Sequence, residues 1–186
     1  MPKATRSPDA GGAVVAFTNP GGIRADLSSS SMHGEVTYGD AFRVQPFGGN
    51  LVTLTLTGSQ IETMLEQQFE GCAGNQATHR ILQVSHGFEY AWNADGPACD
   101  KIDPRTIRIG GASIESDRDY RVTVNDFLAE GGDGFRVFLE GRDRSIDRGH
   151  RNPGTRRVLE TTFARGTTST GPDQTLPSRV LVVRQA

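Results

Sequence analysis

Two side chains in one glycine-rich loop are well suited to bind a flat, hydroxylated ligand. The loop at 125–135, NDFLAEGGDGF, follows a β-rich run and places Phe127 and Asp133 beside three glycines. Glycine lets a backbone adopt positive φ or approach a bound molecule closely, which a Cβ would obstruct. Phe127 is therefore a candidate stacking face, and Asp133 is a candidate hydrogen-bond acceptor.

Two further loops have the same character. One reads NPGGIR over 19–24 and follows the apolar run at 14–17, and the other reads PFGGN over 46–50 and precedes a second apolar run. An aromatic ring stacked on a nucleobase contributes about 1 to 3 kcal/mol. A carboxylate can accept from both hydroxyls of a ribose, and the planar arginine fork suits phosphate or ring acceptors. The candidate substrate-binding residues are Asn19, Arg24, Phe47, Asn50, Phe127 and Asp133.

Each candidate also has an ordinary structural interpretation. The chain contains nine phenylalanines, and phenylalanine most often packs in a core. Paired glycines beside Phe47 and Phe127 weigh against a core role, because core strands seldom need such backbone freedom. Arg24 could equally form a surface salt bridge with a nearby acid.

The three loops, in this order, resemble the C-terminal domain of the 5'-nucleotidase family of bimetallic phosphoesterases. The resemblance extends from about Val14 to Phe138 through GEVTYGD at 34–40, LTLTGSQI at 54–61 and LQVSHG at 82–87. It implies that Phe47 and Phe127 are the base-stacking pair and that Asn19 and Arg24 match the family's Asn and Arg. Two departures are Pro20, where many relatives have glycine, and Glu130, where an uncharged residue is common.

The resemblance also implies a division of labour between two domains. This domain would bind a nucleoside or nucleotide, and a separate N-terminal metallophosphoesterase domain, outside this chain, would hold a divalent metal pair and hydrolyse the ligand. We expect no catalytic residue, metal or cofactor in this chain itself. Its four histidines show no metal-binding spacing, and the sequence has neither a GK[ST] phosphate loop nor a G-x-S-x-G motif.

Length and composition predict one soluble, turn-rich α+β domain, and the resemblance implies mixed β-sheets packed with helices. The chain has 186 residues, 35% hydrophobic residues, 23 glycines and a net charge of −2. That charge argues against polymeric nucleic acid as a partner, and no apolar stretch is long enough for membrane insertion. We expect residues 1–12 to be disordered or vector-derived, because they are polar, and residues 13–186 to form the domain.

Cys72 and Cys99 are the only cysteines. A disulfide between them would stabilise the fold by about 3 kcal/mol, and two inert buried thiols are the alternative. Disulfides persist mainly outside the cytosol. Together with the resemblance, this favours a secreted, periplasmic or cell-surface parent protein. Residues 1–12 lack the apolar segment of a signal peptide.

Hydrophobic patterning predicts the elements that position the loops. We expect strands at 14–17, 50–56, 120–124 and 180–183, and a hairpin at 107–114 around Gly110-Gly111. Ser59 and Glu62 have capping-box spacing for a helix that runs to about Phe69. Asn152-Pro153 predicts a last helix, with apolar positions Val158, Leu159 and Phe163, before a loop at 166–178.

The basic stretch from Arg142 to Arg157 has two interpretations. Interspersed acids and the lack of aromatics favour a solvated face, and an anion-attracting lip near the ligand is the alternative. Two other functions also compete with the nucleotidase assignment. One is a non-catalytic extracellular nucleoside-binding or nucleotide-binding module, and the other is a structural or adhesive domain that retains only the fold.

Overall fold

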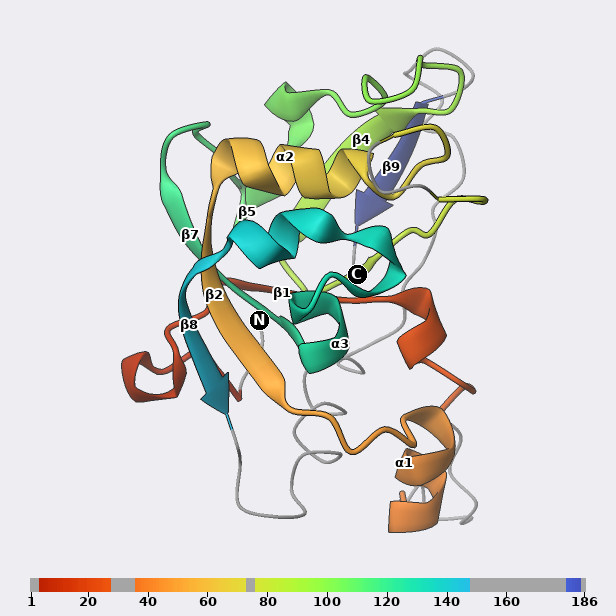
Figure 1. Cartoon of the computed structure of the whole chain (residues 1–186), viewed down its shortest axis with the longest axis vertical. Helices are drawn as coiled ribbons and strands as arrows, with labels where there is room; N and C mark the ends of the chain where they lie inside the picture. The colour runs from red at the N-terminus through yellow and green to blue at the C-terminus, as the bar shows by residue number, and fades with distance from the viewer. Residues whose placement is uncertain (1–3, 28–35, 73–75, 148–179, 185–186) are drawn as a thin grey trace.

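The protein is an α+β domain built from two β-sheets and a few short helices (Figure 1). The structure is a computed structural model that describes residues 4–27, 36–72, 76–147 and 180–184. One sheet has the strand order β3-β1-β7-β2-β8, and the other has the order β6-β5-β4-β9. The predicted fold class is therefore confirmed.

The first sheet is mixed, because β1 pairs with β7 in parallel while the other pairs are antiparallel. Its strands are β1 (Val15–Thr18), β2 (Leu51–Thr57), β3 (Gln83–Val84), β7 (Asp119–Asn125) and β8 (Arg142–Asp147). The second sheet is antiparallel and consists of β4 (Phe88–Asn93), β5 (Arg108–Ile109), β6 (Ala112–Ser113) and β9 (Val180–Arg184). The α-helices are α1 (Tyr38–Val44), α2 (Gly58–Glu66) and α3 (Asp126–Ala129), and the 3-10 turns are η1 (Pro8–Ala10), η2 (Pro20–Gly22), η3 (Pro104–Thr106), η4 (Gly132–Gly134) and η5 (Arg136–Glu140).

Strand register brings the three predicted loops to one edge of the first sheet. The antiparallel β2–β7 pair places Leu51, where β2 begins, opposite Asn125, where β7 ends. Because β1 runs parallel to β7, its C-terminal end lies at that same edge. The loops that follow β1, precede β2 and follow β7 therefore meet there.

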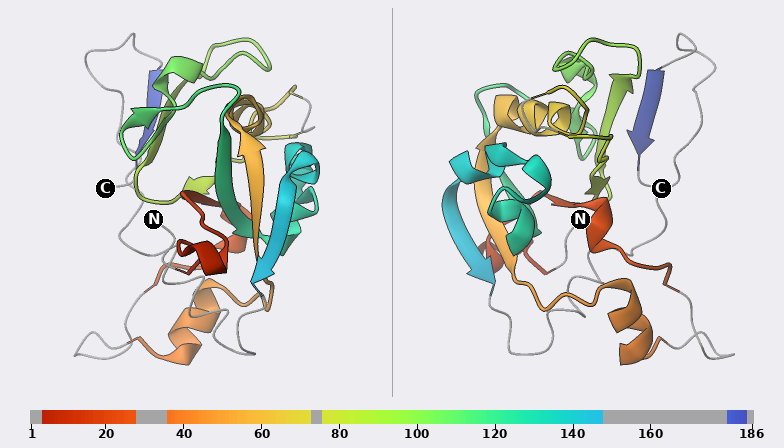
Figure 2. Two further views of the ribbon diagram at one scale, coloured as in Figure 1. Left: turned by 90° about the vertical axis from the view of Figure 1, so that its left-hand side faces the viewer. Right: turned by 45° about the vertical axis from the view of Figure 1, so that its right-hand side comes forward.

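One hydrophobic core joins the two sheets. It includes side chains from β1, β2 and β7, and from β4 of the other sheet. Phe17 and Phe88 meet edge-to-face across the sheets, with ring centroids 4.9 Å apart. Helix α2 reaches from the end of β2 toward β4, and α1 stands apart from both sheets at one end of the molecule (Figures 1 and 2). No helix in the described ranges is long and apolar enough to cross a membrane.

The predicted start of the second helix is wrong by two residues. Thr57, not Ser59, caps α2, and its hydroxyl accepts from the Gln60 N–H at 3.2 Å. Gln60 completes the capping box by accepting from the Thr57 N–H at 2.9 Å. Thr57 is also the last residue of β2, so the strand passes directly into the helix. The helix ends at Glu66 rather than near Phe69, although its expected apolar face is fully buried.

The other predicted elements largely agree with the structure. The strands at 14–17, 50–56 and 120–124 correspond to β1, β2 and β7, and the Gly110-Gly111 hairpin joins β5 to β6. The last predicted strand is β9, which pairs with β4. The helix predicted from Asn152-Pro153 and the loop at 166–178 lie outside the described residues.

Residues 4–12 do not form the disordered segment that was expected. Thr5 is fully buried, and its hydroxyl hydrogen-bonds that of Thr123 on β7 at 2.8 Å. The guanidinium of Arg121 donates to the Gly11 carbonyl at 2.9 Å. The packed unit therefore includes these residues, and the polarity of the segment was misleading because threonine hydroxyls pair inside the core.

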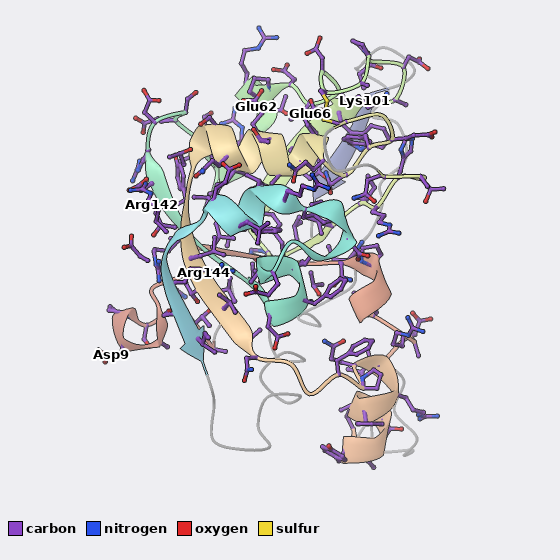
Figure 3. All side chains as sticks on the ribbon, viewed as in Figure 1. Asp9, Glu62, Glu66, Lys101, Arg142 and Arg144 are labelled. Atoms are coloured by element: carbon purple, nitrogen blue, oxygen red, sulfur yellow. A yellow bond between two sulfur atoms is a disulfide. The ribbon has the colours of Figure 1, made fainter. Side chains whose placement is uncertain are left out.

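The described part of the basic stretch agrees with the solvated face and not with a lip at the pocket, because Arg142 and Arg144 are exposed and neither lines the pocket. Arg142 pairs with Asp119 at 2.6 Å, and Arg144 donates to the Ala129 carbonyl and lies 3.5 Å from Glu130. Both arginines extend from β8 on the flank of the first sheet (Figure 3). Residues 148–157 of the stretch lie outside the described ranges.

Cys72 and Cys99 form the predicted disulfide, which closes a loop with a sequence separation of 27. Replacing both cysteines by serine should lower the free energy of unfolding by about 3 to 4 kcal/mol, because the open chain gains entropy when unfolded. Chemical denaturation of the oxidised protein and the double variant measures this. Equal midpoints, or two alkylatable thiols in the unreduced protein, would contradict the bridge.

Glu66 is a buried carboxylate at the end of α2, beside Lys101 (Figure 3). Its Oε1 accepts from the N–H groups of Lys101 and Ile102 at 2.8 and 2.7 Å. Among the described residues, its Oε2 has no hydrogen-bond partner. Burial raises the pKa of Glu66 above the ordinary 4.5, and the two N–H donors only partly oppose that shift.

A raised folded-state pKa means that the folded protein binds this proton more tightly than the unfolded chain does. The stabilisation is therefore present below pH 4.5 and is lost as pH rises through the folded pKa. Glu66→Gln keeps the Oε1 acceptor and removes the charge. We expect the stability of the wild type relative to Glu66→Gln to fall over that rise in pH, as measured by denaturation at several pH values. A pH-independent difference would show that Glu66 does not titrate as described.

Candidate functional site

The three converging loops enclose one pocket of about 470 Å³. All six residues predicted to bind substrate line it: Asn19, Arg24, Phe47, Asn50, Phe127 and Asp133. The remaining lining residues are Gly21, Gly22, Gln45, Gly49, Asn125 and Asp126. The volume is within the usual range for a small-molecule site.

Phe47 and Phe127 are half-exposed, at 48% and 52%, and do not pack in the core. Phe17, Phe69 and Phe88, by contrast, are at most 3% exposed. The interpretation of Phe47 and Phe127 as core residues is therefore wrong. Both rings present apolar surface to the same pocket from segments far apart in the sequence.

The position of the Phe127 ring explains one glycine of the 125–135 loop. A Cβ at Gly132 would lie 2.6 Å from two ring carbons of Phe127 and 2.5 Å from its carbonyl oxygen. Any other residue would displace the ring or the loop. Gly132 therefore lets the ring lie against the backbone that leads to Asp133.

Asp133 is held by partners from two distant segments. Its Oδ2 accepts from Asn19 Nδ2 at 2.7 Å, and its Oδ1 accepts from Arg80 Nη1 at 2.5 Å. Gln76 Nε2 donates to the Asp133 carbonyl. The residue has a left-handed backbone, with φ 53°, which aspartate tolerates better than most residues. Hydrogen bonds thus fix both the carboxylate and the main chain.

A chain of side-chain hydrogen bonds continues from Asp133 to α3. Asn19 is buried, and its Oδ1 accepts from Asn125 Nδ2 at 3.0 Å. Asn125 is the N-cap of α3, and its own Oδ1 accepts from the Leu128 N–H at 2.8 Å. The first loop therefore positions both the carboxylate and the short helix that carries Phe127.

Asp126 links the two loops that carry the aromatic rings. Its Oδ2 accepts from the Asn50 N–H at 2.7 Å, and its Oδ1 accepts from the Phe127 N–H at 3.0 Å. A Cβ at Gly49 would lie 2.5 Å from that Oδ1, so the close approach requires glycine. Asp126 therefore sets the spacing between the 46–50 loop and α3.

Arg24 lines the pocket from the 19–24 loop. Its Nη1 donates to the Gly21 carbonyl at 3.3 Å, and its backbone N–H donates to the Val44 carbonyl at 2.8 Å. Among the ion pairs of the described residues, none involves Arg24. The guanidinium therefore still has N–H donors for an anionic or polar ligand group.

Sequence reasoning missed four residues that shape the site: Gln76, Arg80, Asn125 and Asp126. An asparagine before a short helix is a usual capping signal, so Asn125 was detectable. Arg80 and Gln76 stand some fifty residues before Asp133 in the sequence, and no local pattern links them to it. In the part of the chain that the structure describes, no cluster of three or more His, Cys, Asp or Glu is placed to hold a metal ion.

The arrangement can bind a flat ring between aromatic surfaces and a polyhydroxyl group at a fixed carboxylate. The chain is also similar in sequence to known proteins. The chain is 34% identical over 153 residues to the trifunctional nucleotide phosphoesterase protein YfkN of Bacillus subtilis, a match covering 73% of this chain and 9% of that protein. It is 39% identical over 127 residues to the cell wall protein Lmo0130 of Listeria monocytogenes, covering 66% of this chain and 15% of that protein.

A solved structure is also similar to this chain. The 5'-nucleotidase precursor from Thermus thermophilus superposes with a TM-score of 0.62 at 31% identity, over 86% of this chain and 31% of that one. The chain thus spans less than a third of each of these relatives. The model of the family described as "5'-nucleotidase, C-terminal domain" matches residues 4–140. The chain therefore belongs to the 5'-nucleotidase C-terminal domain family.

Proposed function

We propose that this pocket is the nucleotide-binding site of an exported 5'-nucleotidase-type phosphohydrolase. The observation that carries the proposal is the placement of two half-exposed aromatic rings and one fixed carboxylate around a single pocket. A nucleoside has the matching chemistry, since its base offers two π faces and its ribose offers adjacent hydroxyls. The names of YfkN and of the Thermus thermophilus relative point to the same ligand class.

In the proposed complex, Phe47 and Phe127 contact opposite faces of the base. Asp133 accepts hydrogen bonds from the ribose, and Arg24 and Asn50 contact the base edge or the phosphate at the rim. Asn19 acts mainly by holding Asp133, because it already donates to that carboxylate. Stacking does not distinguish one base from another, so this site would accept nucleotides with different bases.

The chemical step would take place on a second domain of the parent protein. That domain would supply a divalent metal pair, and the domain described here would contribute binding energy and orientation. Export is supported by the disulfide and by the cell wall protein among the relatives.

The role of the Phe47 and Phe127 rings can be tested by substitution. Phe127→Ala and Phe47→Ala should each weaken adenosine binding by about 1 to 3 kcal/mol, because each removes one stacking face. Both should leave the free energy of unfolding nearly unchanged, since the rings are half-exposed. Calorimetric titration with adenosine and AMP up to millimolar concentration, together with chemical denaturation, measures both quantities.

Two phenylalanines serve as controls. Phe42 is 47% exposed on α1 and does not line the pocket, so Phe42→Ala should leave binding unchanged. Phe135 is fully buried, so Phe135→Ala should cost about 3 to 5 kcal/mol of stability. The stacking assignment fails if the Phe47 and Phe127 variants resemble Phe135→Ala in stability, or Phe42→Ala in binding.

A further prediction concerns phosphate-ester hydrolysis by this chain. The chain alone should bind nucleotide without hydrolysing it, because the proposal assigns hydrolysis to another domain. Phosphate release from AMP is measured with added Mg²⁺, Mn²⁺ or Zn²⁺ against a mock-purified control. Turnover that tracks the purified chain and exceeds this control would contradict the assignment.

A further inference from the structure

Two residues that do not line the pocket hold Asp133 from outside it. Arg80 donates to Asp133 Oδ1 at 2.5 Å, and Gln76 donates to the Asp133 carbonyl. Gln76 is buried, at 5% exposed. The backbone N–H of Arg80 donates to the Gln68 carbonyl at 2.8 Å. Arg80 is thus anchored to a fully buried residue that lies just beyond the C-terminal end of α2.

The Asp133 carboxylate can accept more hydrogen bonds than Asn19 and Arg80 donate to it. Each carboxylate oxygen has two lone-pair sites, and Asn19 and Arg80 each occupy one site on a different oxygen. One acceptor site therefore remains on each oxygen. Two adjacent acceptor sites match the two hydroxyls of a vicinal cis-diol.

We propose that Arg80 and Gln76 are positioning residues that make the pocket selective for ligands with a vicinal cis-diol, and thus for ribonucleosides over their dideoxy analogues. This inference rests on the proposed function and adds to it. Arg80 fixes the rotation of the carboxylate, and Gln76 fixes the left-handed backbone that carries it. Without Arg80, the carboxylate can rotate, so its two free sites no longer face the diol together.

An ordinary surface ion pair would behave differently. The Arg80 and Asp133 side chains are 41% and 20% exposed, and such pairs contribute little to stability. If the pair had no further role, its removal would leave ligand selectivity unchanged. Selectivity, rather than stability, therefore separates the two interpretations.

The test compares the affinities of adenosine and 2',3'-dideoxyadenosine by calorimetric titration. For the wild type, we expect adenosine to bind about 10- to 100-fold more tightly, because its diol forms charge-assisted hydrogen bonds. Arg80→Met should bring this ratio close to one while dideoxyadenosine affinity stays the same, since the stacking rings are untouched. Arg142→Met is the matched control, because it removes a comparable surface ion pair with Asp119 on β8. It should leave the ratio at its wild-type value.

Arg80→Lys provides a second variant in case Arg80→Met does not fold. Lysine keeps the charge but lacks the planar fork, so the ratio should fall to an intermediate value. A wild-type ratio in both Arg80 variants overturns the positioning role and leaves the proposed function intact. A wild-type protein that binds both ligands equally also overturns it. Failure of the wild type to bind adenosine at all overturns the proposed function itself.

Discussion

The hydrogen-bonded chain from Asp133 through Asn19 to Asn125 is the interaction on which the site depends. Asn19 connects the carboxylate to the N-cap of α3, so a single buried amide positions both the acceptor and the helix that carries Phe127. Asn19 lies in the 19–24 loop, whereas Asn125 and Asp133 lie near opposite ends of the 125–135 loop, so the network ties these two loops together. A partly buried polar network of this kind gives a unique geometry when its members are satisfied. Asp126 adds a second link, which joins the Phe47 loop to α3.

The mixed sheet makes that network possible. In the first sheet, β7 lies between a parallel neighbour, β1, and an antiparallel one, β2. This combination places two strand ends and one strand start at one edge, and the three loops leave from there. The strands bury their apolar side chains in a core shared with the second sheet, which leaves the loop residues free to remain polar or half-exposed. This separation of a rigid core from the loops that form the site is common in proteins, where rigid elements carry binding loops.

Much of this arrangement was predictable, because it depends on local patterns. A strand is indicated by the alternation at 50–56, and a hairpin by Gly110-Gly111. Glycine pairs near Phe47 and Phe127 indicate loops rather than core strands. The features that the sequence did not predict depend on contacts between residues that are distant in sequence. Arg80 and Gln76 reach Asp133 only through the tertiary fold, and the polarity of residues 4–12 concealed the burial of Thr5 against Thr123. The α2 cap was misplaced because two S/T-x-x-E/Q patterns overlap there, and only Thr57 lies at the end of the strand.

In the proposed complex, the pocket binds a nucleoside with its base stacked against both aromatic rings. A crystal structure of the chain soaked with adenosine tests this most directly. We expect one adenosine in the pocket, its base between the rings of Phe47 and Phe127, and both ribose hydroxyls within hydrogen-bond distance of Asp133. Adenosine bound away from this pocket, or bound within it with the base in contact with neither ring, would contradict this binding mode.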